Sequence, residues 1–227
     1  IDSQRLWKSL MDLARIGATE KGGVRRLALS KLDGEARDLF IRWCKEAGCG
    51  IAIDGIGNIF AQRAGRNNTL PPIITGSHID TQPSGGKFDG NYGVMSGLEV
   101  IRTLNDHKIR TQAPIEVAVW TNEEGSRFTP VMMGSGVFVG AFPLESTLQR
   151  ADLDGVTVGQ ALAQIGYAGA EKIGGRPQGF SAHHNFAVRG LVREPCRDIG
   201  WVSDQLQATA YQVALVHQHQ ARVDSGM

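Results

Sequence analysis

The sequence has little cysteine, no surplus of charge of one sign and no long hydrophobic run. Its three cysteines, Cys44, Cys49 and Cys196, include no CxxC pair, which argues against a disulfide framework and a zinc site built from cysteine. A formal net charge of +1 excludes the basic surface typical of nucleic-acid-binding proteins. No apolar run approaches the roughly 20 residues of a membrane helix, and the N-terminus lacks the pattern of a signal peptide. We therefore expect a cytoplasmic protein with neither a nucleic-acid nor a membrane partner.

Glycine, in contrast, is abundant. The chain has 29 glycines in 227 residues, close to twice the usual share of about 7%. Many of them cluster where the chain leaves predicted strands, which favours a functional site built from loops. The length is sufficient for a sizeable hydrophobic core.

Helical and strand patterns alternate along the first 165 residues. Apolar spacing predicts helices at 3–16, 35–47, 94–104 and 158–165, and short β-like runs predict a hairpin at 51–54 and 58–63 and buried strands from 73 and at 115–121. This order favours an α/β fold with a mainly parallel mixed sheet flanked by helices. Ligands of such folds lie beyond the carboxyl ends of the strands, where two polar clusters occur.

The first cluster contains His78, Asp80 and Asp89. On an extended segment His78 and Asp80 point to the same side, so that the histidine could bind a metal while Asp80 orients its ring. Glycines on both sides of Asp89 would let the backbone bend and bring this carboxylate back toward His78 as a bridging ligand. The alternative is a hydrogen-bonded pair that caps a strand, which is the commoner explanation of an isolated H-x-D.

The second cluster is the adjacent pair Glu123 and Glu124 at the end of the predicted strand 115–121. One carboxylate could coordinate a metal while the other takes a proton from water as a general base. The alternative is a charged turn that faces solvent. Mixed histidine and carboxylate ligation suits Zn²⁺, with Mn²⁺ or Co²⁺ as substitutes.

Three segments, 76–83 (GSHIDTQP), 85–90 (GGKFDG) and 121–128 (TNEEGSRF), resemble the two-zinc amidohydrolases that include N-carbamoyl-L-amino acid hydrolase, β-ureidopropionase and allantoate amidohydrolase. The resemblance covers roughly residues 3–169 and implies a zinc-aminopeptidase-like catalytic domain with two Zn²⁺ per intact site. By resemblance, the implied zinc ligands are His78, Asp89 (bridging) and Glu124; the implied catalytic residues are Glu123 and Asp80; the implied substrate-binding residues are Gln82 and Arg127.

The reaction implied by this resemblance is zinc-dependent hydrolysis of a linear amide C–N bond in a small ureido compound. N-carbamoyl-β-alanine or N-carbamoyl-L-amino acids would yield an amino acid, ammonia and carbon dioxide, and the intact protein would be a homodimer. The alternatives are an allantoate amidohydrolase or related aminoacylase, a metallopeptidase of the same broad fold, and a truncated, catalytically inactive remnant that binds at most one metal or serves as an interaction module.

The last third departs from the family pattern. Where the family supplies a further histidine ligand, this chain has Ala187, with His183 and His184 nearby. We expect residues 1–205 to be the N-terminal part of the catalytic domain, incomplete at its C-terminus. Residues 206–227 would begin a dimerisation domain that is truncated or frameshifted, because 220–225 (QARVDS) replaces a familiar histidine-containing element.

Overall fold

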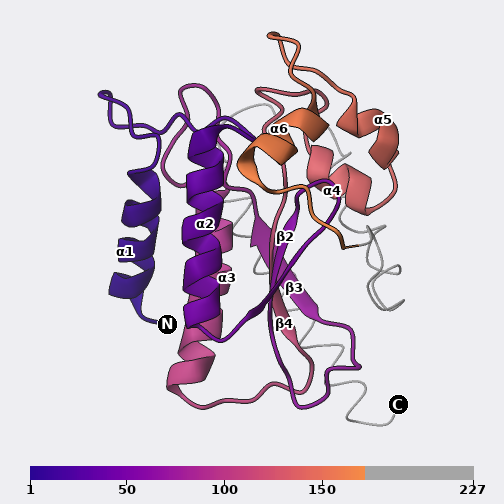
Figure 1. Cartoon of the computed structure of the whole chain (residues 1–227). Coiled ribbons are helices and arrows are strands. Elements are labelled where there is room, and N and C mark those ends of the chain that lie inside the picture. The colour runs from indigo at the N-terminus through magenta and orange to yellow at the C-terminus, as the bar shows by residue number, and fades with distance from the viewer. Residues whose placement is uncertain (172–227) are drawn as a thin grey trace, which may run out of the picture. The chain divides into compact units, whose positions relative to one another are not determined.

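A computed structural model describes residues 1–171 of the chain. Its helices are α1 (Ser3–Ala14), α2 (Lys31–Glu46), α3 (Asn91–Asp106), α4 (Met133–Phe138), α5 (Leu144–Leu148) and α6 (Val158–Ile165), and its strands are β1 (Gly50–Ile53), β2 (Ile59–Arg63), β3 (Ile73–Ser77) and β4 (Ile115–Val119) (Figure 1). The expected mixed α/β architecture is confirmed in this part of the chain.

The four described strands form one sheet in the order β1-β2-β4-β3. The predicted hairpin is confirmed, since β1 pairs with β2 in antiparallel fashion, and β2 pairs likewise with β4. The parallel pairing among the described strands is that of β3 with β4, whose register places Ser77 beside Val119. Both strands therefore end at the same edge of the sheet, and the segments that follow them emerge side by side.

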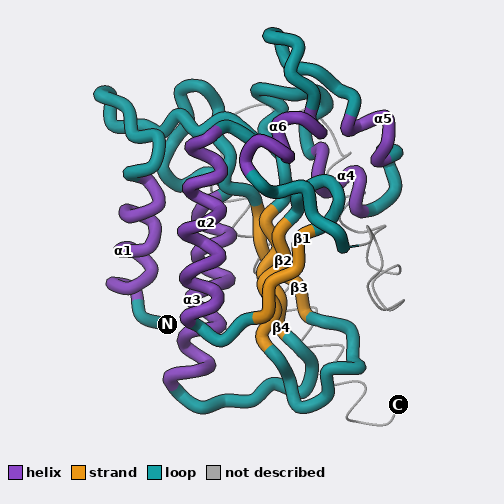
Figure 2. Tube along the Cα trace, viewed as in Figure 1, coloured by secondary structure: helices purple, strands orange, loops and turns teal. Residues whose placement is uncertain are grey.

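Three helices, α1, α2 and α3, lie on one face of the sheet (Figure 2). On that face the β4 residues Val117 and Val119 join a buried cluster with Val94 and Leu98 of α3 and Phe40 of α2. Burial of such side chains contributes about 1.5–3 kcal/mol each before the entropy of ordering is subtracted. The helix layer thus fixes the sheet from which the polar segments project.

The opposite face of the sheet carries a smaller aromatic cluster. Phe60 of β2 contacts Trp120 edge to face, with ring centroids 5.9 Å apart, and both rings contact Phe138 of α4. Trp120 follows β4 directly, and its backbone N–H donates to the carbonyl oxygen of Ser77 at 2.8 Å. This bond extends the parallel pairing to the start of the polar segments.

Helix boundaries follow local capping. The predicted helix 35–47 begins four residues earlier, at Lys31, because the Ser30 side chain accepts a hydrogen bond from the backbone N–H of Asp33. The helix predicted at 3–16 ends at Ala14. Helix α6 has the predicted bounds, with a capping box between Thr157 and Gln160 at its start.

Several expectations fall on residues outside the described part. They concern the domain boundary at 205/206, the departure at Ala187, the nearby His183 and His184, and the altered segment 220–225. Within residues 1–171, none of the helices has the length and hydrophobicity needed to cross a membrane.

Candidate active site

The two polar clusters meet at the carboxyl edge of β3 and β4. His78 and Asp80 follow β3, and Glu123 follows β4. The Nε2 atom of His78 lies 3.3 Å from Oε2 of Glu123 and 3.9 Å from Oδ1 of Asp89. The parallel register of β3 and β4 therefore brings together residues that are 45 positions apart in the sequence, as the sequence predicted from strand ends alone.

His78 is held in one orientation. Its residue is 2% exposed, and Nδ1 donates to the carbonyl oxygen of Asp80 at 2.9 Å. Because Nδ1 is engaged, Nε2 is the ring nitrogen that faces the other acidic side chains. Burial by itself would lower the pKa of His78, but the carboxylates of Asp80 and Glu123 outweigh it and raise the pKa above its usual value.

Asp80 acts mainly on the neighbouring strand end. Its carboxylate oxygens accept hydrogen bonds from the backbone N–H groups of Glu123 and Glu124, both at 3.3 Å. The contact between its carboxylate and Nδ1 of His78 is longer, 3.7 Å. Asp80 thus orients the histidine through its backbone carbonyl, whereas its side chain fixes the glutamate pair. Burial raises the pKa of this carboxyl to about 6.

Asp89 lies in a bend made possible by Gly90. Gly90 has a φ of +65°, a conformation that favours glycine. A Cβ atom at this position would stand 2.5 Å from Cε1 and Nε2 of His78, so the backbone passes directly against the imidazole ring. The side chain of Asp89 is 39% exposed and reaches the site from its solvent side.

The two glutamates have different surroundings. Burial raises the pKa of Glu123, and Glu124 and Asp89 raise it further, although His78 lowers it. The side chain of Glu123 is 31% exposed, so it remains open to solvent. The carboxylate of Glu124 instead accepts a hydrogen bond from Nε2 of Gln82, and Oε1 of Gln82 accepts one from the hydroxyl of Ser126.

Arg127 is anchored within the fold. Its Nε donates to Asp152 at 3.0 Å and one Nη donates to the carbonyl oxygen of Ala28 at 3.1 Å. Its guanidinium also lies over the ring of Phe128, 4.8 Å from the centroid. These contacts tie the segment after Glu124 to two distant parts of the chain.

Two donors of this site, His78 and Asp89, suit a metal ion in type and in spacing. Zn²⁺ binds histidine nitrogen and carboxylate oxygen at about 2.0–2.2 Å, so two donors of one ion can lie up to about 4 Å apart. The 3.9 Å between His78 Nε2 and Asp89 Oδ1 falls within that limit. Residues 1–171 contain no complete group of three metal-binding side chains.

Sequence patterns did not reveal the residues that brace the site. Arg26 is fully buried and donates to the carbonyl oxygens of Ile79 and Leu13 and to the side chain of Asn91. It thereby links the end of β3, α1 and the start of α3. The sequence shows only two adjacent arginines, Arg25 and Arg26, in the otherwise apolar stretch 24–29, which by itself indicates nothing about the partners of Arg26.

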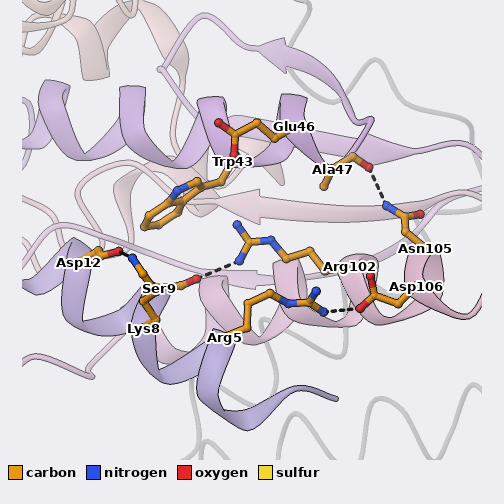
Figure 3. A pocket seen from close by; sticks show the side chains of 10 residues that line it. All are labelled: Arg5, Lys8, Ser9, Asp12, Trp43, Glu46, Ala47, Arg102, Asn105 and Asp106. Atoms are coloured by element: carbon orange, nitrogen blue, oxygen red, sulfur yellow. Dashed lines mark hydrogen bonds and ion pairs between the residues drawn. The ribbon is translucent and has the colours of Figure 1, made fainter.

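A separate pocket lies among α1, α2 and α3, outside the candidate active site (Figure 3). Arg102 projects into it, donating to the hydroxyl of Ser9 and lying over the ring of Trp43, while Arg5 bonds Asp106 at its side. None of the predicted site residues lines this pocket. Its contacts tie α1 to α2 and α3.

Comparison with known proteins gives consistent matches. Residues 74–220 match the model of "Peptidase family M20/M25/M40". An N-carbamoyl-L-amino-acid amidohydrolase of Rhizobium meliloti is 49% identical over 203 residues, which are 89% of this chain and 49% of that protein. An allantoate amidohydrolase of Bacillus subtilis (strain 168) is 33% identical over 155 residues, 68% of this chain and 38% of that protein.

Solved structures agree with these matches. An amidase of the hydantoinase/carbamoylase family from Burkholderia multivorans has a TM-score of 0.77 and 61% sequence identity, covering 78% of this chain and 43% of that one. The chain thus spans half or less of the length of the proteins that it resembles.

Proposed function

Because the chain belongs to peptidase family M20/M25/M40, we propose that its site hydrolyses a linear amide C–N bond in N-carbamoyl amino acids. Water adds to the ureido carbonyl carbon and one C–N bond breaks, which leaves a carbamic acid. The carbamic acid loses carbon dioxide as its own C–N bond breaks, so that the products are an amino acid, ammonia and carbon dioxide. The names of the relatives from Rhizobium meliloti and Burkholderia multivorans support a carbamoyl substrate. The less similar allantoate amidohydrolase supports allantoate as the alternative.

The observation that carries this proposal is the placement of Glu123. Its carboxylate faces His78 Nε2 at 3.3 Å and is open to solvent, while its backbone N–H is fixed by the buried Asp80. A carboxylate whose pKa is raised by burial is a better proton acceptor than an ordinary surface glutamate. We assign to Glu123 the removal of a proton from the attacking water and its return to the leaving nitrogen.

We assign metal binding to His78, Asp89 and Glu124, with Zn²⁺ as the metal and Mn²⁺ or Co²⁺ as substitutes. When bound, the metal would polarise the carbonyl and lower the pKa of water. Two observations support this assignment. The donor atoms of His78 and Asp89 have a suitable spacing, and the backbone N–H of Glu124 is held by a hydrogen bond to the carboxylate of Asp80.

We place Gln82 and Arg127 beside the substrate in different roles. Gln82 bonds both Glu124 and Ser126 at the exposed side of the site, where its amide could also bond the ureido group. Arg127 is committed to Asp152 and Ala28, so we assign it the positioning of the segment 122–128.

The test measures ammonia released from N-carbamoyl-L-amino acids, N-carbamoyl-β-alanine and allantoate by the purified chain supplied with Zn²⁺. Glu123→Gln removes the proton acceptor and should lower kcat by at least about 10²-fold with unchanged zinc content. The matched control is Glu35→Gln on the exposed surface of α2, which should leave kcat unchanged. Full activity of Glu123→Gln would refute the assigned role.

The second candidate is a catalytically inactive protein that binds at most one metal. The observation that favours it is the incomplete donor set of residues 1–171. Zinc counted per chain after dialysis separates the two: about two ions support the hydrolase, whereas one or none, together with no ammonia from any of the three substrates, supports the inactive protein.

A further inference from the structure

The segment that carries Asp89 is bracketed by two contacts of its immediate neighbours. On one side Gly90 presses its backbone against the ring of His78. On the other side the ring of Phe88 lies against the indole of Trp7 in α1, with centroids 5.8 Å apart and an interplanar angle of 32°. Asp89 thus lies between a contact inside the site and a contact at the surface of the molecule.

Trp7 is not explained by the hydrophobic core. Its residue is 56% exposed, although tryptophan is the largest apolar side chain. The buried residues of α1 are Ser9, Leu10, Leu13 and Ala14, and Trp7 belongs to neither of the hydrophobic clusters in the described part of the chain. Removing the Trp7 side chain, and with it the contact with Phe88, should therefore disturb the hydrophobic core little.

The backbone around Phe88 is bonded at both ends, and the carbonyl oxygen of Phe88 itself accepts a hydrogen bond from the backbone N–H of Tyr92 at 2.8 Å. Gly85 exchanges two backbone hydrogen bonds with Val24, at 2.9 and 3.0 Å. At the other end, Asn91 donates through its backbone to the carbonyl oxygen of Asp89 and through its side chain to that of Lys87. The Phe88 side chain is 45% exposed, and the aromatic ring that it contacts within residues 1–171 is that of Trp7.

We propose that Trp7 is a positioning residue for Asp89, acting through its contact with the ring of Phe88. Aromatic pairs hold their rings in a preferred relative geometry, and a fixed Phe88 restricts the backbone of the adjacent Asp89. The carboxylate is then presented to His78 in a narrow range of positions, as a metal ligand requires. This inference rests on the proposed function, because it takes Asp89 as a ligand.

The first test is hydrogen–deuterium exchange of the metal-free protein. Trp7→Ala should speed exchange of the backbone amides of Asn91 and Tyr92, which donate to the carbonyl oxygens of Asp89 and Phe88, by roughly three- to tenfold, the range that corresponds to the usual strength of an aromatic pair. Trp7→Phe keeps a ring and should restore most of the protection, and β4 should be unchanged in both variants. Leu32→Ala, which removes an exposed apolar side chain from α2, is the control.

The second test measures the affinity for Co²⁺ through the visible absorption of the bound ion. The affinity should weaken roughly three- to tenfold in Trp7→Ala and recover in Trp7→Phe. Unchanged exchange of the Asn91 and Tyr92 amides, a uniform rise in exchange over the whole chain, or unchanged Co²⁺ affinity would each overturn the proposal. If the unsubstituted chain binds no Co²⁺ and releases no ammonia, the proposed function fails and the metal-ligand role of Asp89 falls with it. The exchange data then decide separately whether Trp7 holds the segment.

Discussion

Replacing Gly90 by alanine perturbs the site at the point where its backbone is closest to His78. The substitution adds one methyl group with two consequences. Gly90 has a φ of +65°, which is unfavourable for any residue with a Cβ atom. The new Cβ atom would also stand 2.5 Å from Cε1 and Nε2 and 2.6 Å from Cδ2 of the His78 ring, so the ring or the backbone must move.

The two consequences have separable magnitudes. Left-handed helical backbone costs an L-residue about 1–2 kcal/mol, and Gly90, with φ +65° and ψ −51°, lies outside that region, so this figure is a lower bound for it. Overpacking in a filled space costs about 1–3 kcal/mol more. Gly90→Ala should therefore lower the free energy of unfolding by about 2–5 kcal/mol. Gly48→Ala isolates the backbone contribution, because Gly48 has a φ of +81° and nothing within 4 Å of an added Cβ. Gly86→Ala, with open space and no positive φ, should be nearly neutral.

Urea denaturation of the three variants and the unsubstituted chain measures these differences. The expected order of destabilisation is Gly90→Ala, then Gly48→Ala, then Gly86→Ala, and Gly90→Ala alone should weaken zinc binding. Equal destabilisation by Gly90→Ala and Gly48→Ala would refute the close approach of Gly90 to His78. Unchanged zinc affinity in a stable Gly90→Ala variant would refute the link between this approach and the metal-binding geometry.

Two further predictions concern ionisable groups away from the site. Burial alone would raise the pKa of Glu99, but hydrogen bonds from Arg5, the backbone N–H of Asp2 and Thr103 lower it below its usual value. The contribution of ionised Glu99 to the free energy of unfolding is therefore present above about pH 4.3 and is lost as the pH falls through the lowered pKa. Urea denaturation from pH 6 to pH 3 should therefore show a stability difference between the unsubstituted chain and Glu99→Gln that shrinks with acid, whereas a constant difference would contradict this linkage. Burial raises the pKa of the thiols of Cys44 and Cys49, so both should react slowly with a maleimide in the native state and quickly in urea, as site-resolved mass spectrometry can follow. Fast labelling of Cys44 in the folded protein would contradict its burial in α2, and fast labelling of Cys49 would contradict the burial of the segment between α2 and β1.

The location of the site could be predicted because strand order and loop chemistry are local properties. His78 and Glu123 each follow an apolar run in the sequence, and in a parallel pair the carboxyl ends of both strands meet at one edge. The helix at 158–165 could likewise be predicted from its apolar spacing, and the capping box of Thr157 and Gln160 in the structure accounts for its start. The start of α2 at Lys31 was not predicted, because several polar residues near this point could cap a helix. The structure shows that Ser30 is the one that does so.

The division of labour inside the site could not be predicted in the same way. An H-x-D pair indicates that Asp80 lies near His78, but its carboxylate instead accepts two backbone N–H groups from the end of β4. Those donors come from residues more than 40 positions away, so the sequence pattern around Asp80 contains no sign of them. The contact between Trp7 and Phe88 likewise joins residues that are far apart in the sequence, so no local pattern predicts it.

The residue types along the chain predict which side chains could exchange a proton or bind a metal, and that these side chains follow the ends of two strands. Residue type and local spacing suffice for that, because both are fixed by the covalent chain. Only the packing of the folded chain shows which nitrogen of His78 faces Glu123 and Asp89, which groups the Asp80 carboxylate bonds, and which surface side chain lies against the segment of Asp89. These outcomes depend on the packing of α1, β3 and β4, which joins distant residues at distances of a few ångströms.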